Sequence, residues 1–320
     1  MDNKKKVSFV IPCYRSEKTV GAVVAEITDT MNTLPAYTFE IVLVNDSSPD
    51  YTMNTIRDLC KQYPFITGID LAKNFGQHAA LMAGMRATDG DIVVCLDDDG
   101  QTPANEVGKL LDKIEEGFDV CYAHYGKKRH NGFRNMGSKV NEMMTRIMLD
   151  KPKELYVSSY FAAKRFVVDD MLRYEQPYSY VIGLVLRATK NITNVEVTHR
   201  AREVGKSGYT LRKLLSLWFN GFTAFSVKPL RIATIIGTIC ACGGFLYGIY
   251  TIVKKIILGS DVQAGFSALM SVLVFIGGML MLMLGMIGEY VGRMYLCMNN
   301  SPQYVVREVI PAKEKGKDEE

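Results

Sequence analysis

The first 226 residues alternate two kinds of hydrophobic pattern. Short apolar, β-branched runs are typical of buried strands, whereas segments with an apolar residue every three or four positions are typical of amphipathic helices. Strands are predicted at residues 7–11, 40–44, 66–71, 91–96 and 120–123, and helices near 16–31, 52–62, 78–87 and 103–116. Because strands that alternate with helices indicate βαβ units, this part of the chain is predicted to be an α/β domain with a mostly parallel sheet.

The hydrophobic pattern changes after Lys228 and Pro229. Residues 232–253 and 264–287 contain no charged side chain, and each stretch is long enough for a transmembrane helix, which needs about 20 apolar residues. Two buried helices in a large soluble core are the alternative, but two such runs side by side are rare in soluble domains. The connection between them is short, so a transmembrane hairpin is predicted over 229–293, with both of its ends on one side of the membrane.

Charged residues around the apolar stretches predict their orientation. Lys228 and Arg231 precede the first stretch and Arg293 follows the second, whereas two lysines lie in the loop between them. Basic residues are enriched on the cytoplasmic side of membranes. The balance therefore favours a multi-pass protein of the cell membrane, with a cytoplasmic domain over residues 1–210 and a cytoplasmic tail over 294–320.

The segment that leads into the first apolar stretch is amphipathic. Residues 211–225 combine Leu and Phe with Trp218, Arg212 and Lys213. This mixture is typical of a helix that lies among lipid headgroups, so an interface helix is predicted over 211–228. A soluble packing helix is the alternative.

Composition restricts the cellular setting and the partners. The 38 Lys and Arg residues nearly balance the 34 Asp and Glu residues, so no nucleic-acid partner is expected. The seven cysteines are scattered through apolar contexts, which favours a reducing compartment over a disulfide framework. No secretory signal is expected, because the basic residues 4–6 lead directly into a predicted strand. Glycine pairs at 243–244 and 277–278 allow close helix packing, which is compatible with a homo-oligomer.

An acidic cluster follows the predicted strand at 91–96. Asp97, Asp98 and Asp99 are adjacent, and Gln101 adds an amide oxygen two residues later. Adjacent carboxylates repel one another unless a cation or solvent offsets their charge, so the cluster suggests a divalent metal site at the carboxyl end of a strand. A solvated acidic turn explains this segment equally well when it is considered alone.

Two other predicted strands end in polar loops. The first leads into Pro12-Cys13-Tyr14-Arg15-Ser16 and not into a G-x-G-x-x-G turn, which disfavours dinucleotide binding of the Rossmann type. The second leads into residues 45–50, where Asp46 would meet a ribose hydroxyl or a base edge. When that loop is considered alone, a turn rich in Asp, Ser and Pro is the better explanation.

Taken together, these loops resemble those of the GT-A nucleotide-sugar glycosyltransferases of family 2. More narrowly, the chain resembles the polyprenyl-phosphate glycosyltransferases, a group that includes dolichol-phosphate mannose synthases and bacterial undecaprenyl-phosphate sugar transferases. The likeness extends from about residue 7 to residue 293. It includes the segments Asn74-Phe75-Gly76-Gln77, Arg202-x-x-Gly205-x-Ser207 and Gly288-Glu289-Tyr290-x-Gly292-Arg293, together with the predicted hairpin.

The resemblance implies a role for each matching residue. The residues implied in nucleotide binding are Pro12, Tyr14, Ser16, Val44, Asp46, Asp97 and Asp98. Asp97, Asp99 and Gln101 would hold Mg²⁺ or Mn²⁺ against the diphosphate. Arg202 would reach the diphosphate or the acceptor phosphate, so that the implied catalytic residues are Asp97, Asp99 and Arg202.

Basic residues are candidates for binding the acceptor phosphate. They are Lys128, Arg129, Arg134 and Lys206. A solvated basic face is an equally good explanation for each residue taken singly. The chain also departs from its relatives at two positions, because Tyr125 stands where an arginine is frequent and Gly208 stands where several relatives have a lysine; Lys206 would substitute for that lysine.

The resemblance implies an inverting transfer of one sugar from a nucleotide-sugar, UDP-linked by preference, to undecaprenyl phosphate at the cytoplasmic membrane face. The product would be a polyprenyl-phosphate sugar for cell-envelope modification. The second pKa of a phosphate monoester is about 6, so the acceptor needs little help from a general base at neutral pH. The alternatives are a processive polysaccharide synthase, disfavoured by the setting of Trp218, and a non-catalytic membrane scaffold that binds a nucleotide-sugar.

Overall fold

The structure is a computed structural model that describes residues 4–125, 151–198, 265–299 and 301–313, except residues 153 and 178, and some residues between 234 and 257. The chain divides into two units. One comprises Met1–Leu217 together with Ser301–Glu320, and the other comprises Trp218–Asn300. The segment after the apolar region therefore belongs to the same unit as the N-terminal domain.

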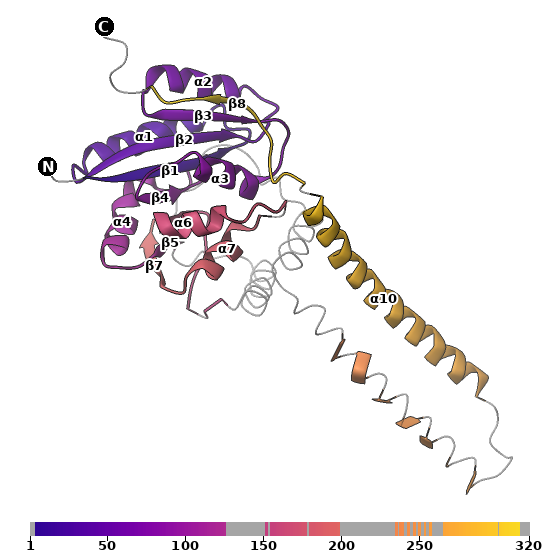
Figure 1. The fold of residues 1–320 in the computed structure, drawn as a ribbon. Helices are drawn as coiled ribbons and strands as arrows, with labels where there is room; N and C mark the ends of the chain where they lie inside the picture. The colour runs from indigo at the N-terminus through magenta and orange to yellow at the C-terminus, as the bar shows by residue number, and fades with distance from the viewer. Residues whose placement is uncertain are drawn as a thin grey trace. The chain divides into compact units, whose positions relative to one another are not determined.

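Strands of the first unit form one mixed sheet (Figure 1). In chain order they are β1 (Lys5–Cys13), β2 (Tyr37–Asn45), β3 (Ile66–Leu71), β4 (Ile92–Cys95), β5 (Val120–Tyr125), β6 (Phe161–Lys164), β7 (Ile192–Val197) and β8 (Val306–Ile310). Their spatial order is β7-β5-β6-β4-β1-β2-β3-β8. Strands β1 to β4 pair in parallel, as do β5 and β7, whereas β6 and β8 run antiparallel to their neighbours. The predicted α/β architecture with a mostly parallel sheet is confirmed.

Helices cover both faces of this sheet (Figure 1). They are α1 (Val20–Asn32), α2 (Thr52–Gln62), α3 (Gln77–Arg86), α4 (Val107–Glu115), α6 (Arg165–Leu172) and α7 (Val181–Ala188), with a 3₁₀ turn, η1, at Ala104–Glu106. The apolar faces of α1, α2 and α4 share one core cluster with alternate residues of β1, such as Phe9 and Ile11. Helix α3 packs Ala80 and Ala83 on the opposite face, against Val42 of β2. The apolar periodicity read from the sequence therefore becomes three layers, helix, sheet and helix.

All the strands and helices predicted from the pattern before residue 125 are present, with ends that differ by a few residues. Strands β6, β7 and β8 were not predicted. The last of these lies in the segment assigned to a C-terminal tail and pairs with β3 at the edge of the sheet.

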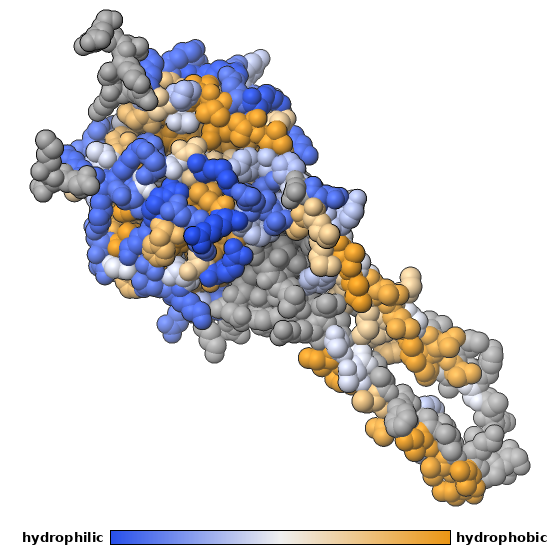
Figure 2. Space-filling view, in the orientation of Figure 1, coloured by the Kyte–Doolittle hydropathy of each residue, from blue (hydrophilic) through white to orange (hydrophobic). Residues whose placement is uncertain are grey.

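The second unit contains a long apolar helix, α10 (Phe266–Met298), of 33 residues. Its part Phe275–Met298 is long and apolar enough to cross a membrane, by length and composition. Large apolar side chains along α10, such as Leu273 and Met281, are exposed (Figure 2), and exposed apolar surface of this extent is unfavourable in water. The described residues between 234 and 257 are also helical. The length and the exposed apolar surface of α10 support membrane association. The predicted interface helix over 211–228 lies outside the described residues.

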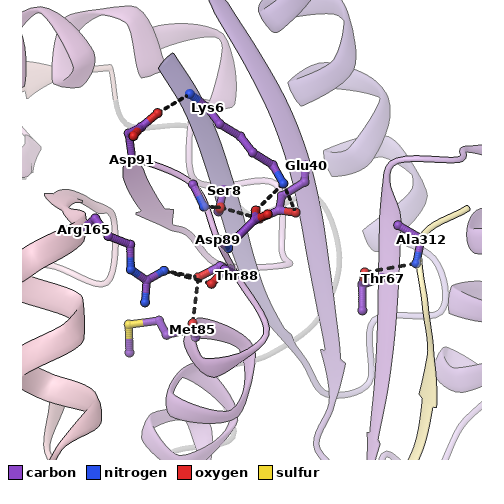
Figure 3. A network of polar contacts seen from close by, with 11 residues as sticks. Lys6, Ser8, Glu40, Thr67, Met85, Thr88, Asp89, Asp91, Arg165 and Ala312 are labelled. Atoms are coloured by element: carbon purple, nitrogen blue, oxygen red, sulfur yellow. Dashed lines mark hydrogen bonds and ion pairs between the residues drawn. The ribbon is translucent and has the colours of Figure 1, made fainter. Parts of the chain in front are cut away.

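A polar network joins the amino ends of β1, β2 and β4 (Figure 3). Lys6 forms ion pairs with Glu40 and Asp89, and its backbone N–H donates to Asp91 at 2.8 Å. Gly90 donates its N–H to the Ser8 hydroxyl at 3.0 Å. These contacts lie at the edge opposite the polar loops, so they stabilise the sheet and contribute no group to those loops.

Candidate active site

The carboxyl ends of three neighbouring strands bring the predicted loops together. Strands β4, β1 and β2 are adjacent and parallel, so the loops that follow residues 13, 45 and 95 leave the sheet at the same edge. Open α/β sheets bind ligands at this edge. The topology therefore places the acidic cluster beside the two polar loops that the sequence identified separately.

The three adjacent carboxylates of the acidic cluster have three different sets of partners. Asp97 accepts hydrogen bonds from Gln77 Nε2 at 2.7 Å and from the Ser159 hydroxyl. Asp98 accepts the backbone N–H of Tyr14 at 3.0 Å and the Ser16 hydroxyl. These contacts tie the cluster to the β1 loop, to α3 and to the segment before β6.

The third carboxylate and the amide lie at the end of the cluster. Asp99 Oδ1 accepts the backbone N–H of Gln101 at 3.1 Å, and Gly100, with φ of 71°, makes the turn between them. The oxygens of Asp99 and Gln101 thus belong to one tight turn. A carboxylate and an amide are hard oxygen donors of the kind that Mg²⁺ and Mn²⁺ bind.

Burial sets the electrostatics of the cluster. It raises the pKa of Asp97 to about 6. The hydrogen bond from Ser159 lowers this pKa, whereas the negative charges of Asp99 and Asp98 raise it further. Burial also raises the pKa of Asp98, although the hydrogen bonds from Ser16 and Tyr14 oppose this. A bound cation would favour the ionised carboxylates.

The donor set fits a cation that is shared with a substrate. Within the described ranges, no group of three or more His, Cys, Asp or Glu side chains is arranged to enclose a metal ion. Mg²⁺ commonly binds one or two protein carboxylates and completes its coordination with substrate phosphates and water. Asp99 and Gln101 fit that arrangement. Asp97, also predicted as a ligand, would have to exchange a hydrogen bond to join it, because both of its oxygens already have donors.

The loops after β1 and β2 contain two residues with unusual backbone conformations. Arg15 has φ of 60° and Ser47 has φ of 49°, in the left-handed region that non-glycine residues rarely adopt. The Arg15 N–H donates to Ser48 Oγ at 2.7 Å, and the Ser16 N–H donates to Thr52 Oγ1 at 2.9 Å. These bonds hold Arg15 against the residue that follows Ser47 and against the start of α2, and backbone strain of this kind is concentrated at functional sites.

The other predicted nucleotide contacts differ in accessibility. Tyr14 is 45% exposed, whereas Pro12, Ser16 and Val44 are buried. The Val44 side chain packs in the core beneath α3, so only its backbone can face a ligand. Asp46 is 3% exposed, and its two oxygens accept the backbone N–H groups of Phe75 at 2.7 Å and Gly76 at 2.9 Å.

The structure identifies residues to which no role was assigned from the sequence. Gln77 lies in the segment Asn74-Phe75-Gly76-Gln77, which is part of the family resemblance, but only the fold shows that it donates to Asp97. Ser159 is 62 residues from Asp97 and carried no sequence signal. The pKa of Tyr125 is raised to about 12, chiefly by burial and in part by the charges of Asp97 and Asp99. This phenol is therefore close enough to the acidic cluster for the charges of Asp97 and Asp99 to act on it.

Several predicted residues cannot be placed. Lys128, Arg129, Arg134, Arg202 and Lys206 all lie outside the described residues.

Two families match this sequence. Residues 8–172 match the family described as Glycosyl transferase family 2, and residues 228–294 match the one described as GtrB C-terminal hairpin. An undecaprenyl-phosphate 4-deoxy-4-formamido-L-arabinose transferase from Serratia proteamaculans is 31% identical over 309 residues, which cover 96% of this chain and 94% of that protein. The transferase of the same name from Salmonella choleraesuis is 32% identical over 308 residues, with the same coverage of 96% and 94%.

Solved structures share the fold at lower identity. Glucosyl-3-phosphoglycerate synthase from Mycobacterium tuberculosis, in complex with Mn²⁺, UDP and phosphoglyceric acid, superposes with a TM-score of 0.50 at 20% identity. The match covers 67% of this chain and 74% of that chain. A mycobacterial protein superposes with a TM-score of 0.51 at 17% identity, over 69% and 75% of the two chains. The predicted GT-A fold is confirmed.

Proposed function

Because this chain belongs to glycosyl transferase family 2, in its polyprenyl-phosphate subgroup, we propose that it transfers a single sugar from a nucleotide-sugar to undecaprenyl phosphate. The observation that carries this proposal is the convergence of the β1 loop, the β2 loop and the acidic cluster at one edge of the sheet. The near full-length similarity to undecaprenyl-phosphate transferases supports the acceptor class.

The donor would occupy the edge formed by these loops. The residues that would border the nucleotide are Pro12, Tyr14, Ser16, Asp46, Asp97 and Asp98, together with the backbone of Val44. A UDP-linked donor is our preference, in line with the UDP bound in the mycobacterial synthase. The hydrogen bonds that Asp98 accepts from the β1 loop would preorganise the nucleotide site before the donor binds.

Asp99, Gln101 and Asp97 are the proposed ligands of Mg²⁺ or Mn²⁺. When bound, the cation would stabilise the negative charge that develops on the leaving diphosphate. The chain's own contribution is to hold these oxygens in one turn and to fix Asp97 through Gln77 and Ser159. Arg202 would add positive charge at the same phosphates.

The reaction would be a single displacement. An oxygen of the acceptor phosphate forms a bond to the anomeric carbon while the bond from that carbon to the diphosphate oxygen breaks, and the configuration inverts. The acceptor is ionised near neutral pH, since its second pKa is about 6, so no general base is needed. Lys128, Arg129, Arg134 and Lys206 are the proposed ligands of this phosphate.

The apolar unit explains how such an enzyme would reach its acceptor. A polyprenyl chain stays in the bilayer, so the hairpin proposed over 229–293 and the interface helix over 211–228 would hold the catalytic domain at the headgroups. We place the domain on the cytoplasmic face, from the basic residues that flank the hairpin. The lipid-linked sugar would then serve cell-envelope modification.

The test is a donor screen with purified full-length protein in detergent. Undecaprenyl phosphate, Mn²⁺ and a panel of UDP- and GDP-sugars are supplied, and nucleoside diphosphate release is measured together with the mass of the lipid. We expect one donor to give a lipid carrying one sugar, and Asp99→Ala to abolish the product.

Other results would contradict this proposal in whole or in part. A lipid or polymer that carries several sugars would indicate a processive synthase. Nucleotide binding without any transfer from the panel would indicate a non-catalytic scaffold or a sugar that the panel lacks. Full retention of activity without Mn²⁺ and Mg²⁺ would leave the proposed transfer standing and contradict only the proposed metal dependence.

A further inference from the structure

The C-terminal strand β8 is built into the catalytic unit, although it follows the apolar helix α10 in the sequence. It pairs antiparallel with β3, with Gly68 opposite Ile310 and Asp70 opposite Glu308. Contacts beyond the ladder fix both of its ends. The N–H of Ala72 donates to the Val305 carbonyl at 2.8 Å, and the N–H of Ala312 donates to Thr67 Oγ1 at 3.3 Å (Figure 3).

Arg307 of this strand holds a buried carboxylate. Its Nη1 lies 3.1 Å from Asp70 Oδ2, and its Nη2 donates to the Ala72 carbonyl at 2.7 Å. The Asp70 side chain is 4% exposed, whereas that of Arg307 is 57% exposed. A buried carboxylate needs such compensation, because removing one partner leaves its charge without a counterion.

The second oxygen of the same carboxylate reaches the end of β2. Asp70 Oδ1 accepts a hydrogen bond from Asn45 Nδ2 at 2.7 Å. The side-chain amide oxygen of Asn45, Oδ1, accepts the Ser48 N–H at 3.2 Å, which closes the turn that contains Ser47 with its positive φ. If the Asn45 amide were rotated by 180°, its Nδ2 would face the N–H of Ser48, donor against donor. Its Oδ1 would then face the carboxylate of Asp70, acceptor against acceptor. Asp70 therefore selects the Asn45 orientation that closes the turn.

The chain of hydrogen bonds continues from the β2 loop to the β1 loop. Ser48 Oγ accepts the Arg15 N–H at 2.7 Å, where Arg15 itself has a positive φ. An unbroken series of contacts thus runs from Arg307 through Asp70, Asn45 and Ser48 to Arg15. It connects the C-terminal strand to both loops that would border the nucleotide.

We propose that Arg307 is a positioning residue for the nucleoside diphosphate site, acting through Asp70 and Asn45 on the loops after β1 and β2. The ligand class rests on the function proposed above, whereas the positioning of the loops does not. Loss of Arg307 leaves Asp70 without its guanidinium partner, which weakens the selection of the Asn45 amide and loosens both loops. Nucleotide binding should suffer, while the transfer step, which depends on the acidic cluster, should not.

The next residue on the strand supplies a matched control. The backbone of Glu308 lies opposite Asp70 in the ladder, but its side chain pairs with Arg57 of α2 at 2.6 Å and, among the described contacts, bonds to no residue of the series. The pKa of Arg57 is raised, first by its hydrogen bond to Glu308 and only last by the charge of Asp70. Glu308→Gln therefore removes a charged contact from the same strand and leaves the bonds between Arg307 and Arg15 in place.

The first measurement is hydrogen–deuterium exchange on full-length protein in detergent, without nucleotide. In Arg307→Ala, we expect peptides that contain residues 12–16 and 45–50 to exchange faster, by on the order of tenfold, which is the effect of losing a hydrogen bond to a charged group. Glu308→Gln should leave these peptides unchanged, and Arg307→Lys should restore part of their protection. Equal exchange in Arg307→Ala and wild type, or equal acceleration in both strand variants, would overturn the proposal.

The second measurement is the affinity for UDP and, in parallel, for GDP, each with Mn²⁺. Arg307→Ala should raise the Kd of the nucleotide and the KM of the donor by on the order of tenfold and leave kcat within about twofold. Adding Asp70→Asn to Arg307→Ala should cause little further loss, because the two residues act in one series.

The two proposals fail in different ways. A wild-type protein that binds neither nucleotide contradicts the proposed function, whatever the exchange shows. Equal nucleotide affinity of wild type and Arg307→Ala contradicts the proposed role of Arg307. A loss of kcat with unchanged KM also contradicts it.

Discussion

At the scale of single residues, the three carboxylates of the acidic cluster are held by different partners. Three adjacent carboxylates would repel one another, but Asp97 is bound by Gln77 and Ser159, and Asp98 is bound by the β1 loop. Asp99 is left at the turn with Gln101. One run of identical residues thus provides three functions: a positioned carboxylate, a link between loops and a proposed metal ligand.

Ser159 tests whether the position of Asp97 matters. Ser159→Ala removes the hydroxyl that donates to Asp97, and we expect kcat/KM to fall about tenfold, since hydrogen bonds to charged groups contribute about 1.5–3 kcal/mol. Ser158→Ala is the control, because the Ser158 hydroxyl contacts the backbone carbonyls of Ala123 and Tyr160 instead. Steady-state kinetics with melting curves check this, and equal kinetic losses in both variants would contradict it.

His78 gives the protein a pH dependence outside the acidic cluster. Its Nδ1 is buried without a partner among the described residues, and burial lowers the pKa of the imidazole to about 4. The unfolded chain therefore binds more protons than the folded one between about pH 6.5 and pH 4. We expect the contribution of neutral His78 to the free energy of unfolding to be fully present above pH 6.5 and to be lost as the pH falls toward 4.

This contribution is at most about 3.4 kcal/mol, from 1.36 kcal/mol per pKa unit, and smaller to the extent that solvent reaches the exposed part of the residue. Chemical denaturation followed at several pH values between 4 and 7 measures it. His78→Gln should flatten the profile in that window. A variant profile parallel to that of wild type would show that His78 is not responsible.

At the scale of elements, α3 connects the core to the site. Its amino end is bound through Phe75 and Gly76 to Asp46, and Gln77 reaches Asp97. Its middle approaches the sheet closely at Gly84, where a Cβ would lie 2.4 Å from Val10 Cγ1. The position of α3 on the sheet therefore also sets the position of two site residues.

Gly84→Ala tests this close packing. Alanine favours an isolated helix over glycine by about 1 kcal/mol, but here the methyl group would overlap Val10 and Val44. We expect the free energy of unfolding to fall by about 1–3 kcal/mol, the usual effect of overpacking. Gly21→Ala in α1 is the control, because nothing lies within 4 Å of its added Cβ. Denaturant titration of both variants measures their free energies of unfolding. A higher value for Gly84→Ala than for wild type would contradict the packing argument.

At the scale of the whole molecule, the catalytic unit is assembled from both ends of the chain. The apolar unit lies between Leu217 and Ser301 in the sequence, and the chain then returns to the sheet as β8. Gln303, 7% exposed, donates to the carbonyls of Tyr174 and Gln176 before that strand begins. The C-terminal segment therefore stabilises the domain at more than one place.

Truncation tests this assembly. A chain that ends at residue 300 lacks β8 and leaves the edge of β3 unpaired, so we expect a lower melting temperature and more aggregation in detergent. A chain that ends at residue 313 keeps every described contact of β8 and should behave like wild type. Melting curves and size-exclusion profiles of the two truncated proteins are compared. Equal stability of both would show that β8 is dispensable for folding.

The sequence by itself determined the elements whose signal is local. The apolar periodicity predicted β1 to β5 and α1 to α4, and the acidic cluster, the two polar loops and the apolar stretches were visible as short segments. Only the tertiary structure decided which groups meet across long separations. Strand β6 is four residues long and enters the sheet between β4 and β5, and β8 is a short, partly exposed edge strand.

The physical reason is that hydrogen bonds between distant residues leave no periodic trace in the chain. Ser159 and Asp97 are 62 residues apart, and Arg307 and Asp70 are 237 apart. Such pairs depend on strand order and register, which are set by the packing of the whole sheet. Candidate site residues could therefore be proposed from their types and their positions after strands, whereas the groups that hold those residues in position were established by the fold.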